Sequence, residues 1–194
     1  MRRICISLII TLLLLSHFTV DSSARTYLTK AQALKQVFPT STEIKEEKKV
    51  LTTAQKREIE KKLGRKLKET SFTFYLGMTE GRIDGYALIL DEIGKHRPIT
   101  FIIAIDPGGK VKDVTLMVFR ETRGDIGRKK RFFRQYRGKT SQDPIKLHRD
   151  IDAVTGATLS ARAANVAVKK ALVLYEELYL GGKQKVQSEE KNRG

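Results

Sequence analysis

The residues best suited to chemistry in this 194-residue chain are two threonines that flank a glycine. Residues 152–160 read DAVTGATLS, which predicts a loop that turns into a helix. A helix start offers unpaired backbone N–H groups and the positive end of the helix dipole. Gly156 permits an unusual backbone angle and leaves room for a ligand. The pattern predicts an anion site at Thr155 and Thr158, although an ordinary N-cap by either threonine also accounts for the hydroxyl groups.

Few residues in the chain suit other redox or hydrolytic chemistry. The single cysteine is Cys5, and the histidines beyond residue 24 are His96 and His148. We therefore expect no disulfide, thiolate metal site, iron–sulfur cluster, c-type haem or histidine-rich metal site in that part of the chain. A hydrolase with Thr158 or Ser160 as nucleophile is disfavoured, because no general base stands near them in the sequence.

Residues 1–24 have the features of a secretory signal peptide. Arg2 and Arg3 precede an apolar run over residues 4–15, and Ser22 and Ala24 supply the small side chains that signal peptidase requires. The apolar run is short for a membrane span, but an uncleaved anchor that extends to residue 20 is the alternative. Under either interpretation the rest of the chain is exported, to the periplasm or another extracytoplasmic compartment.

The net charge of +16 favours anionic partners. These include lipid head groups, cell-wall polymers and an acidic redox protein. Nucleic acid is not expected as a partner, because the chain is predicted to be exported. The charge can also serve solubility alone.

Hydrophobic periodicity predicts an α+β domain. An antiparallel sheet of about four strands is expected at residues 72–77, 83–90, 99–105 and 111–119, with the third strand central because its apolar run is nearly continuous. Residues 43–50 are strongly charged and fit either an edge strand or an exposed segment. Flanking helices are predicted at residues 29–38, 52–64 and 128–136, followed by a long C-terminal helix at residues 158–180.

The Asp-x-x-Thr-Gly-Ala-Thr stretch closely resembles the flavin-attachment motif of FMN-binding domains. These domains occur in extracytoplasmic flavin subunits of bacterial electron-transport complexes. In that family the last threonine, here Thr158, carries covalent FMN through a phosphoester after a flavin transferase has delivered it from FAD with magnesium. The resemblance covers about residues 70–178 and includes the segments at residues 85–87, 106–110 and 119–122, and the Phe133-x-Gln135-Tyr136-x-Gly138-Lys139 segment.

The resemblance implies roles for particular residues. The transferase would read Asp152, Thr155, Gly156 and Ala157 around the attachment residue. Glu121 and Thr122 match a Glu-Thr pair that lies beside the flavin in the family. The chain departs from the family pattern at two positions near that pair, where Phe119 replaces a histidine and Arg123 replaces a proline.

Phe132, Phe133 and Tyr136 fall on one side of the predicted helix at residues 128–136. Core packing is the favoured interpretation for them, with stacking on the flavin ring as the alternative. The basic residues 128–131 fit a solvated face, or a surface that docks a partner or lipid.

The predicted organisation is a signal peptide at residues 1–24, a helical and charged lead-in at 25–69, an FMN-binding domain at 70–180 and a disordered polar tail at 181–194. The predicted function is a redox carrier or subunit that relays electrons between a membrane redox partner and an extracytoplasmic acceptor. A noncovalent module for FMN or phosphate and a cofactor-free basic protein of the envelope are the alternatives.

Overall fold

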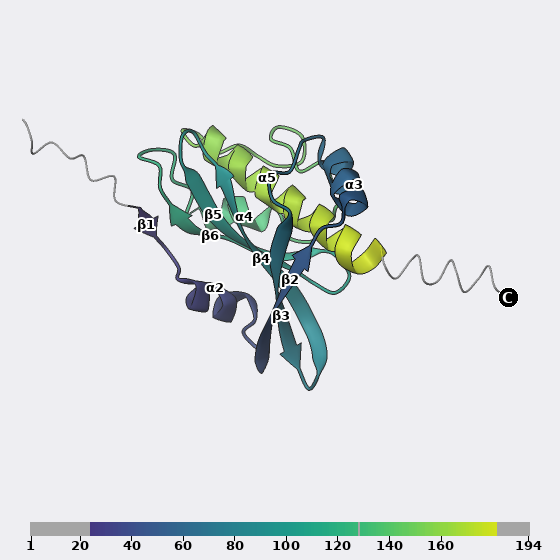
Figure 1. The fold of residues 1–194 in the computed structure, drawn as a ribbon. Helices are drawn as coiled ribbons and strands as arrows, with labels where there is room; N and C mark the ends of the chain where they lie inside the picture. Colours follow the sequence, from purple (N-terminus) through teal and green to yellow (C-terminus); the bar gives the residue numbers. More distant parts are fainter. Residues whose placement is uncertain (1–23, 128, 182–194) are drawn as a thin grey trace, which may run out of the picture.

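The computed structural model describes residues 24–127 and 129–181, which form one antiparallel sheet of six strands in the order β1-β6-β5-β4-β3-β2 (Figure 1). The α+β prediction is confirmed, but the expected strand number of about four is wrong. The two additional strands lie at the edges, where one is very short and the other is highly charged, so neither shows clear apolar alternation. The strands are β1 (Arg25–Thr26), β2 (Glu43–Val50), β3 (Ser71–Thr79), β4 (Arg82–Ile93), β5 (Pro98–Ile105) and β6 (Val111–Phe119).

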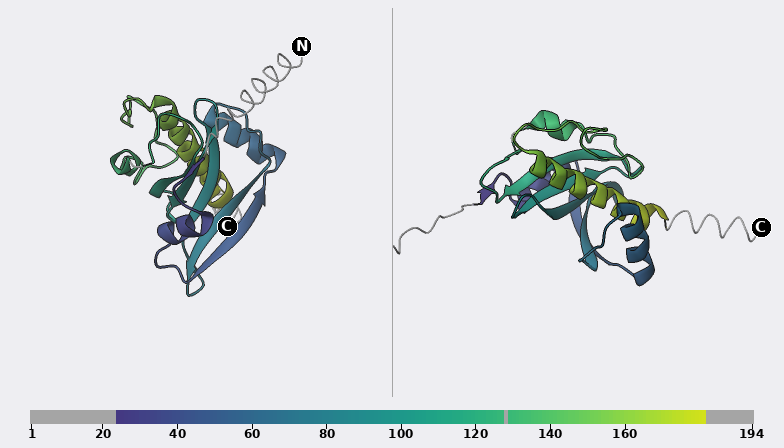
Figure 2. Two further views of the ribbon diagram at one scale, coloured as in Figure 1. Left: turned by 90° about the vertical axis from the view of Figure 1, so that its left-hand side faces the viewer. Right: turned by 90° about the horizontal axis from the view of Figure 1, so that it is seen from above.

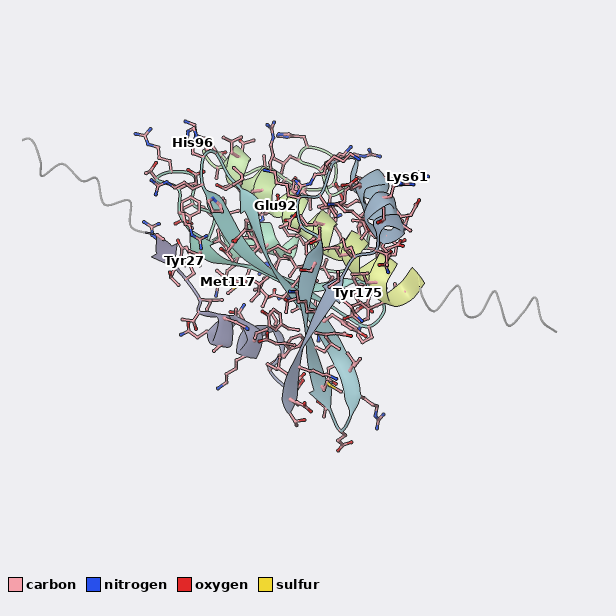
Figure 3. The ribbon with its side chains drawn as sticks, viewed as in Figure 1. Tyr27, Lys61, Glu92, His96, Met117 and Tyr175 are labelled. Carbon is pink, nitrogen blue, oxygen red and sulfur yellow. The ribbon has the colours of Figure 1, made fainter. Side chains whose placement is uncertain are left out.

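Helices cover both faces of the sheet. The long helix α5 crosses one face diagonally, and α2 lies against the other (Figures 1 and 2). Met117 packs in the core on the α2 side and Tyr175 in the core on the α5 side (Figure 3). The helical elements are α2 (Lys30–Val37), α3 (Thr53–Leu63), α4 (Lys130–Arg134), α5 (Thr158–Tyr175) and a final π-helical turn η1 (Glu176–Leu180).

Strand β5 shows why its sequence is almost continuously apolar. Successive side chains of a strand point to opposite faces. Phe101 and Ile103 therefore belong to the core beneath α5, whereas Ile102 and Ala104 belong to the core beneath α2. Because both faces are covered, nearly every position of the strand is apolar, and the hydroxyl group of the buried Thr100 is paired with Asp91 and Arg120. The prediction of a central strand is confirmed.

Local signals place the first two helices correctly. Thr29 and Thr52 each form a capping box with the glutamine three residues later, and Gly64 ends α3 in the left-handed conformation. The basic helix predicted at residues 128–136 is shorter in the structure, where α4 spans Lys130–Arg134. The long helix begins at Thr158 as predicted, and its last five residues are π-helical.

Within residues 24–127 and 129–181, none of the helices has the length and apolar character needed to cross a bilayer. The predicted signal peptide and polar tail lie outside the described residues, except for Ala24 and Gly181.

Candidate functional site

The Thr-Gly-Ala-Thr stretch forms a tight turn that leads directly into α5. The backbone N–H of Ala157 donates to the carbonyl of Val154 at 3.0 Å, which closes the turn. Gly156 has a φ angle of 76°, in the left-handed region that glycine tolerates best. A Cβ atom at Gly156 would meet nothing within 4 Å. The glycine is therefore required by its backbone angle, and the space around it is open.

The start of α5 has no side-chain cap. The N-cap residue is Ala157, its side chain cannot accept a hydrogen bond, and the first turn contains no acidic residue. The alternative interpretation of Thr155 or Thr158 as an ordinary N-cap is therefore wrong. The first helical N–H groups lack intrahelical partners. The half-buried Thr158 also has a hydroxyl group with no hydrogen bond to any described residue.

A second loop lies against this turn. Gly124 has a φ angle of 79° and sits so close to the motif that a Cβ atom there would lie 3.3 Å from the Ser160 Oγ and 3.4 Å from the Gly156 carbonyl oxygen. This loop contains Glu121 and Thr122, so the structure brings the segment of the predicted Glu-Thr pair to the attachment motif. Sequence reasoning did not identify Gly124, because a glycine within a charged loop does not by itself predict a contact with the motif.

Glu121 is held by the turn between β4 and β5. Its Oε1 accepts hydrogen bonds from the backbone N–H groups of His96 and Arg97, the second at 2.8 Å. Burial alone would raise the pKa of Glu121, but hydrogen bonds from the backbone of Arg97, His96 and Lys95 lower it below its ordinary value. Glu121 therefore fixes the β4–β5 turn, while Thr122 is exposed. His96 lies at the end of the molecule where α5 begins (Figures 1 and 3).

The beginning of the motif is anchored to the segment that follows α4. The backbone N–H of Asp152 donates to the Gln135 Oε1 at 2.8 Å, while the Asp152 side chain is exposed. The neighbouring Tyr136 is fully buried, and its hydroxyl group donates to the Asn165 Oδ1 on α5 at 2.6 Å. Phe132 and Phe133 are buried as well, so the core-packing interpretation of these three aromatic residues is confirmed.

A groove of about 580 Å³ runs along α5 from its first turn. Leu159 and Arg162 line it from the helix, and Ile93 and Gly94 line it from the end of β4. Its inner part is charged, because Lys170 lies there between Glu69 and Glu92. Arg65, Lys66, Lys68 and Asp91 also line the groove, so most of its lining is charged.

The fold and the turn define an α+β domain in which a long helix presents an uncapped start to the surface. Residues 94–173 match the family model described as the FMN-binding domain. The match contains the motif, Glu121 and Thr122, and it begins later than the resemblance inferred from the sequence.

The structure also resembles the crystal structure of Shewanella oneidensis NqrC. The TM-score is 0.53 at 16% sequence identity, and the similarity covers 77% of this chain and 88% of that one. At this identity the likeness concerns the fold. Among the curated proteins compared, none matches this chain.

Proposed function

We propose that this chain is an exported electron-transfer protein that carries FMN on Thr158 through a phosphoester. The observation that carries the proposal is the position of Thr158 inside the family match. There it is the first residue of an uncapped helix, and its hydroxyl group has no partner among the described residues.

The residues at the helix start suit a phosphate group. The N–H groups of the first turn of α5 and the positive end of its dipole offset negative charge. An acidic residue there would repel a phosphate, and the first turn has none. The open space around Gly156 lets a ligand approach the backbone. The donor set therefore fits the phosphate of FMN at Thr158.

Attachment requires a flavin transferase with FAD and magnesium. The Thr158 oxygen would form a bond to the phosphorus on the FMN side of FAD, and the pyrophosphate P–O bond would break. AMP leaves, and the hydroxyl proton passes to solvent or to a base of the transferase. Asp152, Thr155, Gly156 and Ala157 surround Thr158 and are the residues we expect the transferase to recognise. Asp152, Thr155 and Gly156 are exposed, as such recognition requires.

FMN attached at this position would supply one- or two-electron transfer. The protein's contribution is to hold the attachment point on a rigid helix beside the loop of Glu121 and Thr122. Covalent attachment suits an exported protein, because a weakly held cofactor would be lost to dilution. We propose a membrane redox protein and an extracytoplasmic acceptor as electron partners. The basic surface would favour a place near anionic membrane or wall polymers.

Covalent attachment can be tested on a denaturing gel. The chain is coexpressed with an active flavin transferase in a host that exports it. We expect a fluorescent band that disappears in Thr158→Val and persists in Thr53→Val, since Thr53 is exposed on α3 and lies outside both the motif and the family match. A dark wild-type band whose mass shows no FMN, despite an active transferase, would rule the phosphoester out.

The same experiment separates the alternatives. A noncovalent module for FMN or phosphate would use the same helix start, and its yellow colour would be lost on denaturation. A cofactor-free basic protein of the envelope would be colourless, and its retention on anionic lipid would fall steeply with salt.

A further inference from the structure

A second groove, of about 580 Å³, lies between the end of α3 and the loop that precedes the attachment motif. We call it the basic groove, because none of the described residues that line it is Asp or Glu. A concave surface that carries one sign of charge concentrates ions of the opposite sign. The cationic residues of the lining are Lys61, Lys62, Arg65, Lys146, Arg149 and Lys169.

Three of these cations form no ion pair within the described part of the chain, and all three are exposed. Lys61 belongs to α3 (Figure 3), whereas Lys146 and Arg149 belong to the loop on the other side of the groove. Lys62 and Arg65 differ from them, because each pairs with a glutamate outside the groove. Unpaired cations on two facing walls can bind the same anionic ligand between them.

Lys169 contributes a further positive charge from α5. It is half-buried, and its Nζ donates hydrogen bonds to the backbone carbonyls of Ser141 at 2.5 Å and Asp143 at 2.7 Å. These acceptors are neutral, so they fix the ammonium group without removing its charge. Lys169 therefore joins the loop to α5 and adds to the positive potential of the groove.

The loop that carries Lys146 and Arg149 is held firmly. Its buried Ile145 has a φ angle of 49°, which a β-branched residue rarely adopts. The Asp150 carboxylate accepts hydrogen bonds from the backbone N–H groups of Ile145 at 3.0 Å and Lys146 at 2.8 Å. A backbone of this kind persists only where its surroundings hold it. This wall of the groove is therefore formed before any ligand binds, which lowers the cost of binding.

The shape and composition of the basic groove favour a charged chain over a protein or a bilayer. None of the large apolar side chains that are exposed in the described chain lines it, whereas the core of a protein interface is usually apolar or aromatic. A bilayer is flat and cannot enter a groove. Phosphate groups on a slender chain can enter it, since the guanidinium of Arg149 suits phosphate geometry and the lysines bind phosphate as point charges.

We propose that the basic groove binds an extended anionic chain that carries phosphate groups, such as a phosphate-bearing polymer of the cell envelope. Lys61 on one wall and Lys146 and Arg149 on the other are the residues that contact it. The choice of an envelope polymer over a nucleic acid rests on the proposed export of the chain. The binding itself needs no flavin, so it extends the function beyond electron transfer.

Binding of a short, fluorescently labelled polyphosphate to the full chain tests this assignment. Fluorescence anisotropy is measured over a series of salt concentrations. The triple variant Lys61→Gln/Lys146→Gln/Arg149→Gln should bind about tenfold more weakly at moderate salt. The slope of the logarithm of the binding constant against the logarithm of the salt concentration should become shallower by about 2, since each phosphate contact contributes about 0.7 in single-stranded nucleic acid.

Lys129→Gln/Lys130→Gln/Arg131→Gln is the matched control. It removes the same charges from exposed residues at the start of α4, outside the basic groove. We expect this variant to keep the salt slope of the wild type. Equal losses in the two triple variants would show attraction by net charge alone and would overturn the proposal.

Two further probes separate other partners from a phosphate chain. Vesicles that contain phosphatidylglycerol should lose affinity equally for both triple variants, because a flat surface does not select the groove. A loss of vesicle binding confined to the groove variant would overturn the proposal in favour of a lipid site, and polyglutamate that binds as tightly as polyphosphate would overturn it in favour of an acidic protein. A chain without flavin can still bind polyphosphate, so failure of this proposal is distinguishable from failure of the phosphoester.

Discussion

The hydroxyl group of Tyr27 donates a hydrogen bond to the carboxylate of Asp125, which joins the beginning of the described chain to the loop beside the attachment motif. Arg25 donates to the same carboxylate oxygen. The ring of Tyr27 also packs against Gly127, where a Cβ atom would lie only 2.5 Å from the ring. Since Asp125 follows Gly124, the segment Arg25–Tyr27 positions the loop that contacts Gly156 and Ser160.

Tyr27→Phe should destabilise this loop. The change removes a hydrogen bond to a charged group, and we expect the free energy of unfolding to fall by about 1–2 kcal/mol. Denaturant titration of Tyr27→Phe, Asp125→Asn and the double variant measures the coupling between the two residues. Additive effects of the two substitutions would contradict a direct interaction.

The contribution of Asp125 should depend on pH. Burial alone would raise its pKa, but hydrogen bonds from Tyr27, the Gly127 backbone and Arg25 lower it below the ordinary value. A carboxyl whose pKa is lowered in the folded state stabilises the fold above its unfolded pKa, about 3.9 for aspartate. That stabilisation is lost as the pH falls through the lower, folded pKa.

The stability difference between wild type and Asp125→Asn should therefore shrink as the pH falls below about 4. Thermal unfolding of both proteins at a series of pH values measures it. A difference that stays constant down to the acid limit would show that the charge of Asp125 is not what stabilises the loop.

Gly124→Ala should impair the site more than the matched substitution Gly138→Ala. The two glycines have φ angles of 79° and 78°, so both substitutions carry a similar backbone cost of about 1–2 kcal/mol. Only Gly124 lies against the motif, whereas a Cβ atom at Gly138 would meet nothing within 4 Å. We expect Gly124→Ala to reduce the fraction of chain that a transferase flavinylates, as measured by intact mass. Equal fractions in both variants would refute a role for this contact.

The elements that the sequence predicted well are those defined by local signals. Thr52, Gln55 and Gly64 delimit α3 because a capping box and a left-handed glycine act within a few residues. The apolar run from Ile99 to Ile105 identified the central strand because both faces of the sheet are covered.

The parts that sequence reasoning missed depend on contacts between distant residues. Strand β1 is two residues long and exists because Arg25 and Thr26 pair with Phe119 and Val118. Glu121 binds the β4–β5 turn through backbone N–H groups, which every turn possesses. No pattern of side chains in the sequence therefore predicts this interaction. The motif around Thr158 was identified from its residue types, but the uncapped state of the helix required the structure.

Lys170→Met should destabilise the fold strongly, because it breaks a buried charge cluster. Lys170 is 2% exposed, and its Nζ lies 3.2 Å from Glu69 and 2.5 Å from Glu92 (Glu92 is labelled in Figure 3). Removal of the lysine leaves the buried Glu92 with Arg65 as its remaining cationic partner in the described chain. We expect a loss of about 3 kcal/mol in denaturant titration. Lys66→Met removes an exposed lysine that pairs with Glu60 and should change stability by less than about 1 kcal/mol. Similar losses of stability in the two variants would mean that burial does not determine how much the ion pairs of Lys170 contribute to the free energy of unfolding.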